Sequence, residues 1–286
     1  MAVSANDVPE AFTYVNANTS NEYTLLLDAN VMIGAQNLNS ANAKLTIIGI
    51  GVERFITANS SNGRLFSIDG SNANLTLGKN ITLMGKSATT HMIYVQRGTL
   101  NILNGSKITG HWSASTSVNV VSITGINAGF KMEGGEISEN TINYYSFISV
   151  VNVSAGATFE MSGGTVAGNS AYMDVFINDD NSKFLLSGSA RISTIYLYAN
   201  NNTTRSTITI VGNYSGTINT LHLSGNNTNL TNVAAFWTNA PVIVNGTAGI
   251  ISMFNNGSLG NFRVGSGSTP IRNTHELNAN GILVRK

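Results

Sequence analysis

The acidic side chains are the residues whose spacing can be tested most directly against a known chemistry. Hydrolysis of a glycosidic bond needs two carboxylates about 5 to 9.5 Å apart beside one bond. A lyase needs several carboxylates to hold Ca²⁺ and a Lys or Arg that acts as the base. The acidic candidates in the repeated part of the chain are Asp69, Glu133, Glu136, Glu139, Glu160, Asp174, Asp179 and Asp180.

These carboxylates do not recur at one position of the internal repeat that the chain contains. Asp179 and Asp180 precede a strand-like segment, where a solvated turn is the ordinary role of such residues. Glu136 aligns with Lys107 of the preceding copy, which indicates an exposed ion pair of small energetic value. We therefore predict no catalytic residues.

The sequence also contains no residue pattern that is typical of a metal or cofactor site. The chain has no cysteine, which excludes thiolate ligands, a cysteine nucleophile and disulfides. The histidines are dispersed without metal-ligand spacing, and they are His91, His111, His222 and His275. No phosphate-binding or dinucleotide-binding loop occurs in a strand–helix context. No metal and no cofactor are expected.

Aromatic residues do recur at one place in the repeat. Six of them lie 12 to 15 residues after the residue that opens their copy, and they are Trp112, Tyr144, Tyr145, Tyr172, Tyr196 and Tyr198. In "TIYLY" the alternation places Ile195 and Leu197 on one face and both tyrosines on the other. An outward strip of rings suits stacking on sugars or contact with a protein. The alternative is that the rings pack against neighbouring loops or inside the fold.

Composition favours β-structure without strong charge. Charged residues make up 10% of the 286-residue chain and the formal net charge is +1, so no nucleic-acid-binding surface is indicated. Hydrophobic residues make up 42%, which is enough to bury a core. β-Branched residues and turn formers dominate over strong helix formers. No apolar run is long enough to span a membrane.

The repeat is the strongest signal in the sequence. Its copies open on an apolar residue at steps of 30, 25, 30, 29, 25 and 24 residues, namely Leu45, Leu75, Leu100, Phe130, Phe159, Phe184 and Ile208. Each copy then has a glycine-containing turn and an Ile or Val, at Ile81, Ile108, Ile137, Val166, Ile192 and Ile218. A further apolar strand follows in each copy, as in "HMIYV" (91–95) and "MDVFI" (173–177).

Short strands of this kind cannot bury their inner faces alone, but successive turns of a solenoid bury them. The sequence therefore predicts an all-β fold, a right-handed parallel β-helix of roughly ten coils with about 4.8 Å per coil. A β-sandwich or a β-propeller is disfavoured, because a sandwich would not repeat and a propeller blade is longer. Gly134–Gly135 and Gly163–Gly164 mark one corner of two coils, where Asn140 and Asn169 suit turns or a stacked amide ladder.

We expect one domain over residues 1–286, because no linker divides the chain. Residues 1–24 form an N-terminal cap with a short helix, in which Asp7 and Glu10 make a capping box and Phe12 and Val15 face the first coil. Residues 25–229 form the regular coils. Residues 230–286 form one or two atypical coils and a C-terminal cap that ends in a strand near residues 282–284.

The turn segments "GSKITGH" (105–111), "GGEISEN" (134–140) and "GGTVAGN" (163–169) resemble a known family. Large surface proteins of spirochaetes such as treponemes carry a similar G-G-x-I-S-G-N in right-handed, pectin-lyase-like β-helix repeats. The segments also resemble the GGAI motif of polymorphic autotransporter passenger domains. The resemblance covers residues 45–211 and implies a secreted or cell-surface, adhesin-like bacterial protein.

Two functions stay open at this point. The favoured one is a non-enzymatic module that binds a glycan or a host or cell-surface protein through a lateral face. The other is a polysaccharide lyase or glycoside hydrolase with a lateral groove. Carboxylates that converge with a Lys or Arg in a groove would favour the enzyme, and an aromatic or amide-lined wall would favour the binder.

Overall fold

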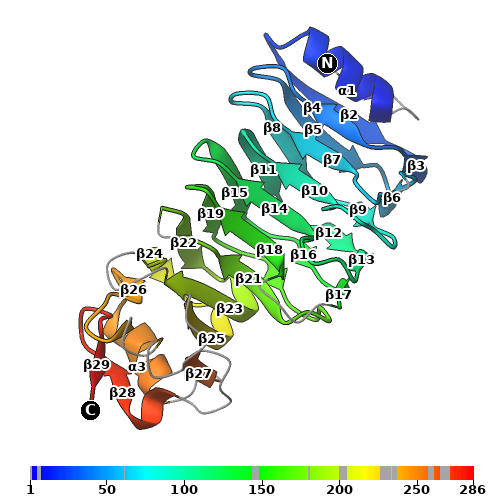
Figure 1. The fold of residues 1–286 in the computed structure, drawn as a ribbon. Coiled ribbons are helices and arrows are strands. Elements are labelled where there is room, and N and C mark those ends of the chain that lie inside the picture. The colour runs from blue at the N-terminus through cyan, green and yellow to red at the C-terminus, as the bar shows by residue number, and fades with distance from the viewer. Residues whose placement is uncertain are drawn as a thin grey trace.

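The chain winds along one axis, so that each turn stacks its strands in parallel on those of the turn before (Figure 1). The computed structural model describes residues 2–4, 8–60, 62–143, 148–179, 181–199, 205–225, 233, 237–256, 261–264 and 271–286. The fold is a parallel β-helix of about seven turns, fewer than the roughly ten expected. The expectation was too high because much of the C-terminal region forms other structure.

Each turn contributes strands to three faces of the solenoid. The first face is a ten-stranded sheet made of β1 (Ala2–Ser4), β2 (Glu22–Leu27), β5 (Lys44–Gly49), β8 (Asn74–Leu77), β11 (Gly98–Ile102), β15 (Ala128–Met132), β19 (Thr158–Met161), β22 (Lys183–Gly188), β24 (Ile208–Tyr214) and β26 (Ile243–Val244).

The other two faces share one continuous sheet because β23 (Arg191–Ala199) runs along both of them. The second face holds β3 (Val31–Ile33), β6 (Arg54–Ala58), β9 (Ile81–Met84), β12 (Ser106–Thr109), β16 (Glu136–Ile137) and β20 (Thr165–Val166). The third face holds β4 (Gln36–Leu38), β7 (Phe66–Ile68), β10 (Ile93–Val95), β14 (Val121–Thr124), β18 (Ser149–Ser154), β21 (Met173–Ile177), β25 (Thr217–Gly225) and β27 (Asn261–Val264). A two-stranded sheet, β13 (Trp112–Ser113) with β17 (Thr141–Ile142), lies between the second and third faces.

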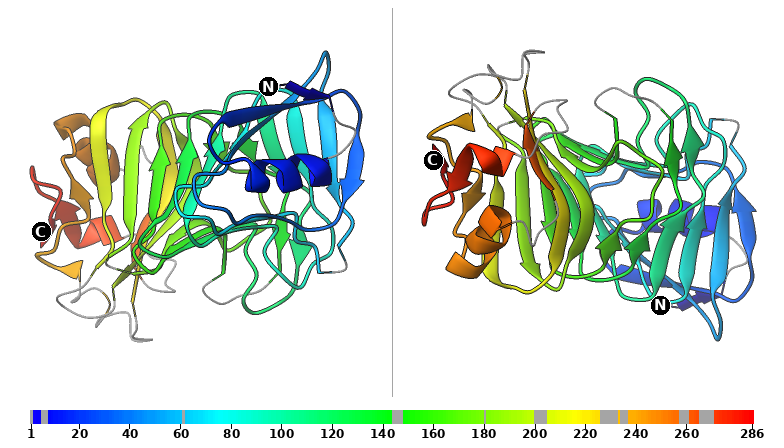
Figure 2. Two further views of the ribbon diagram at one scale, coloured as in Figure 1. Left: turned by 90° about the horizontal axis from the view of Figure 1, so that it is seen from above. Right: turned by 90° about the horizontal axis from the view of Figure 1, so that it is seen from below.

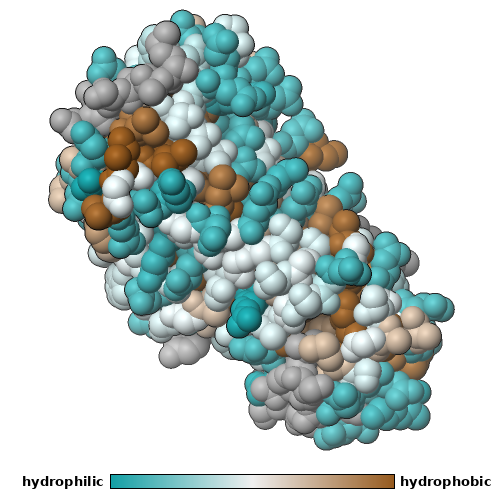
Figure 3. Space-filling view, turned by 180° about the vertical axis from the view of Figure 1, so that it is seen from behind, coloured by the Kyte–Doolittle hydropathy of each residue, from teal (hydrophilic) through white to brown (hydrophobic). Residues whose placement is uncertain are grey.

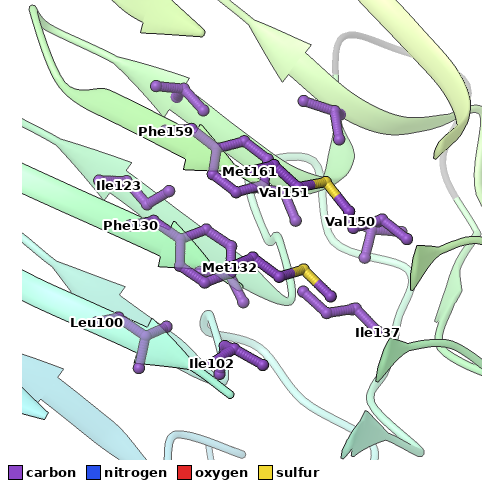
Figure 4. Packing of buried hydrophobic residues seen from close by; sticks show 14 of the residues in the cluster. Leu100, Ile102, Ile123, Phe130, Met132, Ile137, Val150, Val151, Phe159 and Met161 are labelled. Carbon is purple, nitrogen blue, oxygen red and sulfur yellow. The ribbon is translucent and has the colours of Figure 1, made fainter. Parts of the chain in front are cut away.

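The predicted repeat anchors lie one above the other on the first face. Leu100 pairs with Phe130, Phe130 with Phe159, and Phe159 with Phe184. The rings of Phe130 and Phe159 stack with centroids 4.6 Å apart, and the neighbouring core side chains form parallel rows (Figure 4). This stack of buried apolar side chains is the main source of stability, because each turn removes the inner face of its neighbour from water.

One register in the predicted repeat was wrong. Ile108, Ile137 and Val166 do form a column on the second face. Ile108 aligns with Leu83, however, and not with Ile81, which stands opposite Ser106. The shift of two residues preserves the inward direction of both side chains, so the apolar pattern alone does not distinguish the two registers.

The N-terminal end of the solenoid is covered by α1 (Val8–Ala17), which lies across the open turn (Figure 2). Phe12 and Val15 are buried beneath it as predicted, and Phe12 stacks on Phe66 with centroids 5.2 Å apart. The Asn16 amide nitrogen donates to the Asn37 carbonyl oxygen at 2.8 Å, and its oxygen accepts from two backbone N–H groups after β4. Asp7, the predicted capping residue, lies outside the described residues.

The C-terminal region is less regular than the coils. β26 and β27 extend the first and third faces by short strands. The helix α3 (Ala248–Asn256) lies between these two strands in the chain, and β27 is followed by the 3₁₀ turn η1 (Ile271–Asn273) and an antiparallel hairpin of β28 (His275–Leu277) and β29 (Leu283–Arg285). The strand near the C-terminus was predicted, whereas α3 was not, because its buried Ile250, Ile251 and Phe254 lie in a segment that reads as β-like.

The surface shows the low charge of the composition. On the face seen in Figure 3, hydrophilic and near-neutral residues cover most of the area, and hydrophobic residues gather in separate patches. The apolar residues with the largest exposure include Met32, Val52 and Ile126. A rod with this surface relies on hydroxyl and amide groups for its solubility and for its contacts.

Candidate functional site

The predicted aromatic strip is divided by the structure. Tyr144 and Tyr145 lie outside the described residues. Trp112 lies in β13 and pairs with Thr141, whereas Tyr196 lies on the third face opposite Phe176. Counting residues from the anchor placed Trp112 and Tyr196 at equivalent positions, which is wrong. The turn with Trp112 has the extra strand β13 between its second and third faces. In the turn with Tyr196, β23 passes between these faces without such a strand.

The remaining tyrosines form a closed aromatic cluster. Ile195 and Leu197 point into the main core, and Tyr196 points away from it, as the alternation predicted. Tyr196 is nevertheless only 5% exposed, because it stacks on His222 at 4.2 Å between centroids and contacts Tyr172. Tyr172 is 42% exposed, so it and the half-buried Tyr198 present the accessible part of this cluster.

Tyr196 belongs to a longer row of outward side chains on the third face. Apart from Asn37, which follows Gln36, each residue of this row lies between two apolar residues, as in I-Y-V or V-N-V, and these two neighbours point inward; we call such a group an apolar triplet. Register relates each member to the next, and we name the row the outward column: Asn37, Ser67, Tyr94, Ser122, Asn152, Phe176, Tyr196, His222 and Arg263.

A groove of about 330 Å³ lies over the middle of the outward column. We name it the amide–aromatic groove, and its lining includes His91, Tyr94, Asn119, Ser122, Asn152 and Asn178. Among the described residues, its lining contains hydroxyl, amide, imidazole, phenol and aliphatic groups but no carboxylate, lysine or arginine. Such a surface suits an uncharged ligand rich in hydroxyl groups.

The rings of the groove are held in place by their neighbours. His91 and Tyr94 stack with centroids 5.3 Å apart, and the Arg64 guanidinium lies 5.1 Å from the centre of the Tyr94 ring. The backbone N–H of Asn119 donates to His91 Nδ1 at 2.9 Å, which places the imidazole proton on Nε2. Burial lowers the pKa of His91 to about 4, so the ring is neutral at physiological pH.

Asn119 also fixes the wall of the groove formed by the segment before β14. Its amide nitrogen donates to the Ser149 carbonyl oxygen at 2.9 Å, so this side chain joins two successive turns. Buried amides with all donors paired hold a single conformation, because any other one leaves a polar group unsatisfied. The groove is therefore formed before a ligand binds.

A second hollow, of about 640 Å³, lies at the glycine corner between the first and second faces. Its lining includes Glu53, Lys107, Glu136, Gly135 and Gly164, and we name it the glycine-corner hollow. Lys107 Nζ lies 3.7 Å from Glu136, as predicted, and 3.1 Å from the Glu139 carboxylate. Lys107 holds the pKa of Glu139 below its usual range, which keeps that carboxylate ionised.

The residues of this corner have roles in the fold itself, either through their backbone conformation or through hydrogen bonds and ion pairs with one another. Gly135 and Gly164 adopt φ values of +72° and +79°, which a residue with a side chain rarely tolerates. Thr82 donates to Glu53, and Ser138 donates to Glu136. The glutamate of each ion pair with Lys107 is exposed to solvent, so these pairs contribute little to stability.

The predicted amide ladder is present beside this corner. Asn140 donates to Asn169 at 2.9 Å, and Asn169 donates to Asp174 at 3.0 Å. Asp174 also accepts from the Thr194 N–H, and its burial raises its pKa to about 6. The carboxylate ends a run of paired amides and faces neither hollow's lining. We assign it a structural role.

The residues of the amide–aromatic groove were missed by sequence reasoning. The sequence shows His91 only as one of four dispersed histidines without metal-ligand spacing, and Tyr94 lies outside the predicted strip. The sequence signal that could have identified Tyr94 is the apolar triplet. The segments "IYV" (93–95) and "IYL" (195–197) place Tyr94 and Tyr196 at the same point of their turns. The triplet defines the register where distance from the anchor does not.

Comparison with protein-family models, curated proteins and solved structures finds no match to this chain. The family resemblance of the turn segments therefore stays a prediction. Among the residues that the structure describes, no helix is long and apolar enough to cross a membrane. In the same residues, His, Asp and Glu side chains form no group of three that could hold a metal ion.

Proposed function

We propose that this protein is a non-enzymatic, adhesin-like module that binds a glycan in the amide–aromatic groove. The observation that carries the proposal is the uncharged lining of this groove, in which Ser122 and Asn152 lie beside the paired rings of His91 and Tyr94. Sugars are bound by stacking on flat rings and by hydrogen bonds to hydroxyl and amide groups. A secreted or cell-surface location and a bacterial origin are part of the proposal and derive from the family resemblance.

A protein partner is the less favoured ligand for this groove. The volume of the groove, about 330 Å³, lies at the lower end of the range for small-molecule sites. A stable protein interface instead buries about 800 Å² on each partner, usually around a central apolar anchor. The groove offers hydroxyl and amide groups in place of such an anchor.

A glycan array tests the proposal and locates the site. We expect the protein to bind one class of neutral glycan, and Tyr94→Ala and Asn152→Ala to weaken that binding at least tenfold. Trp112→Ala is the matched control, because Trp112 is an exposed ring (43%) that lies outside the groove. Loss of binding in the Trp112 variant alone would move the site to the predicted aromatic strip, and no binding to any glycan would reject the proposal.

A polysaccharide lyase or glycoside hydrolase is the second candidate. One observation favours it, since Glu53, Lys107 and Glu136 line the same glycine-corner hollow. A hydrolase would need one carboxyl group that holds its proton near neutral pH. A degradation screen over neutral and acidic polysaccharides tests this candidate, with Glu136→Gln as the inactive variant. Activity that survives this substitution would exclude the hollow as its source.

A further inference from the structure

The imidazole of His91 is held in one tautomer by the backbone of the next turn. The Asn119 backbone N–H donates to His91 Nδ1 at 2.9 Å, so Nδ1 is the acceptor and the neutral ring carries its proton on Nε2. Asn119 is itself buried, and its side-chain amide donates to the Ser149 carbonyl oxygen at 2.9 Å. The group that sets the tautomer is therefore fixed as well.

The His91 ring is also held by its aromatic neighbour. It stacks on Tyr94 with centroids 5.3 Å apart, and the Arg64 guanidinium lies 5.1 Å from the centre of the same tyrosine ring. Burial, together with the charge of Arg64, lowers the pKa of His91 to about 4. A neutral ring held in this way keeps Nδ1 as the acceptor and Nε2 as the donor.

The second ring nitrogen of His91 is available to a ligand. Within the part of the chain that the structure describes, the side chain uses Nδ1 for its hydrogen bond and leaves Nε2 without a partner. Ring nitrogens that are both buried and unpaired occur there in His111 and His222 but not in His91, so Nε2 is not sealed inside the protein. His91 is half-buried and lines the amide–aromatic groove. Its N–H is thus an oriented donor that exists before a ligand binds.

The other polar groups of the groove are more adaptable than this donor. Ser122, Thr124 and Ser154 carry hydroxyl groups, each of which can rotate to donate or to accept. The Asn152 amide donates to Ser154 Oγ at 3.3 Å and has both a further N–H and an oxygen to offer. His91 Nε2–H can only donate. A ligand that covers it without an acceptor leaves it unpaired, which reduces affinity more than the loss of an adaptable contact.

We infer that His91 is the specificity-determining donor of the amide–aromatic groove, and that its Nε2–H binds an oxygen of the glycan as acceptor. This inference depends on the proposed glycan binding and adds a chemical requirement to it. The sugar in contact with His91 must present an acceptor oxygen at that point. A sugar that carries a hydrogen there in place of a hydroxyl group should be rejected.

Two substitutions separate the donor from the ring that carries it. His91→Gln keeps a side-chain N–H and removes the ring, whereas His91→Phe keeps a ring beside Tyr94 and removes both nitrogens. The probes are cellohexaose, maltohexaose and N-acetylchitohexaose, titrated calorimetrically. For the probe that binds, we expect His91→Phe to weaken binding at least tenfold and His91→Gln to weaken it less than fivefold. Circular dichroism and denaturant titration establish that both variants fold.

Deoxy sugars test the same contact in the unchanged protein. The probes are disaccharides of the binding series in which one hydroxyl group at a time is replaced by hydrogen. We expect one of these replacements to weaken binding at least tenfold in the unchanged protein and less than twofold in His91→Phe, because that variant has no donor to leave unpaired.

Nuclear magnetic resonance tests the tautomer without a ligand. At pH 7 the ¹⁵N shifts of the His91 ring should show the proton on Nε2. A proton on Nδ1 would overturn the inference, because the nitrogen on the groove side would then be an acceptor.

The outcomes separate the two proposals. Hexaose binding that His91→Phe leaves unchanged, or deoxy replacements whose effects do not depend on His91, would overturn the role of His91 and leave glycan binding in place. If neither the three hexaoses nor any neutral glycan on the array binds, the proposed function fails, and the inference about His91 fails with it.

Discussion

The amide–aromatic groove and the glycine-corner hollow are two hollows of opposite chemistry in the described part of the solenoid. The glycine-corner hollow contains ionised side chains and backbone with unusual φ angles, and its polar groups pair with one another. The lining of the amide–aromatic groove is neutral, and three of its residues, Tyr94, Ser122 and Asn152, point away from the core at the middle of apolar triplets. The difference indicates that the corner residues are constrained by the fold, whereas the outward column is free to vary for binding.

The corner should therefore be the more sensitive of the two to substitution. Gly164→Ala places a side chain at φ +79° and against the carbonyl group of Gly134. We expect a loss of about 3 kcal/mol in the free energy of unfolding, measured by denaturant titration. Gly34→Ala is the control, because nothing lies within 4 Å of its added carbon, and its effect should be small. Equal stability of the two variants would show that the corner tolerates a side chain at residue 164 and is not constrained there by the fold.

We expect acid to lower the stability of the coils through the buried residue His111. Burial lowers the pKa of His111 to about 4, and its ring nitrogens have no hydrogen-bond partner in the described part of the chain. The folded-state pKa lies below the unfolded value of 6.5, so stability is complete above pH 6.5 and is lost as the pH falls toward 4. The loss reaches roughly 3 kcal/mol for this residue.

His111→Leu measures that contribution. The free energy of unfolding of the variant should fall less between pH 7 and pH 4 than that of the unchanged protein. The comparison at each pH cancels the contribution of Asp174, whose raised pKa has the opposite sign and favours the folded state as the pH falls. An identical fall in both proteins would show that the His111 ring is protonated without cost.

The smallest effect is expected at the ion pairs of the corner. Lys107→Met removes both contacts of the lysine with Glu136 and Glu139. Because both carboxylates are partly exposed, we expect a change below about 1 kcal/mol that becomes smaller in high salt. Glycan binding should stay unchanged. Weaker binding in this variant would sharpen the case for the glycine-corner hollow as the functional site.

The sequence predicted the stacking of the turns well because the signal is redundant. Phe130, Phe159 and Phe184 repeat both an apolar anchor and its distance to a glycine turn, so errors at one copy are corrected by the next. The candidate site was predicted poorly for the converse reason. In the outward column no two neighbouring members share a residue type, so no column of identical residues marks the register, and the loops between the faces differ in length.

The aromatic strip illustrates this limit. Alternation gave the direction of Tyr196 correctly, but it could not show that Phe176, Tyr172 and His222 cover the ring. Those contacts connect residues of successive turns and follow from register. The side-chain direction of a strand residue is a local property, whereas its accessibility depends on the neighbouring turns.

Asn16 gives the N-terminal end of the rod a particular chemistry. Its amide offers β4 one donor and one acceptor in the places where a further strand would offer peptide groups. Beneath α1, the open edge at β4 is thus covered by a side chain that imitates a backbone. A solenoid ended in this way can gain or lose internal turns by duplication or deletion of a repeat, and its length can evolve independently of its terminus.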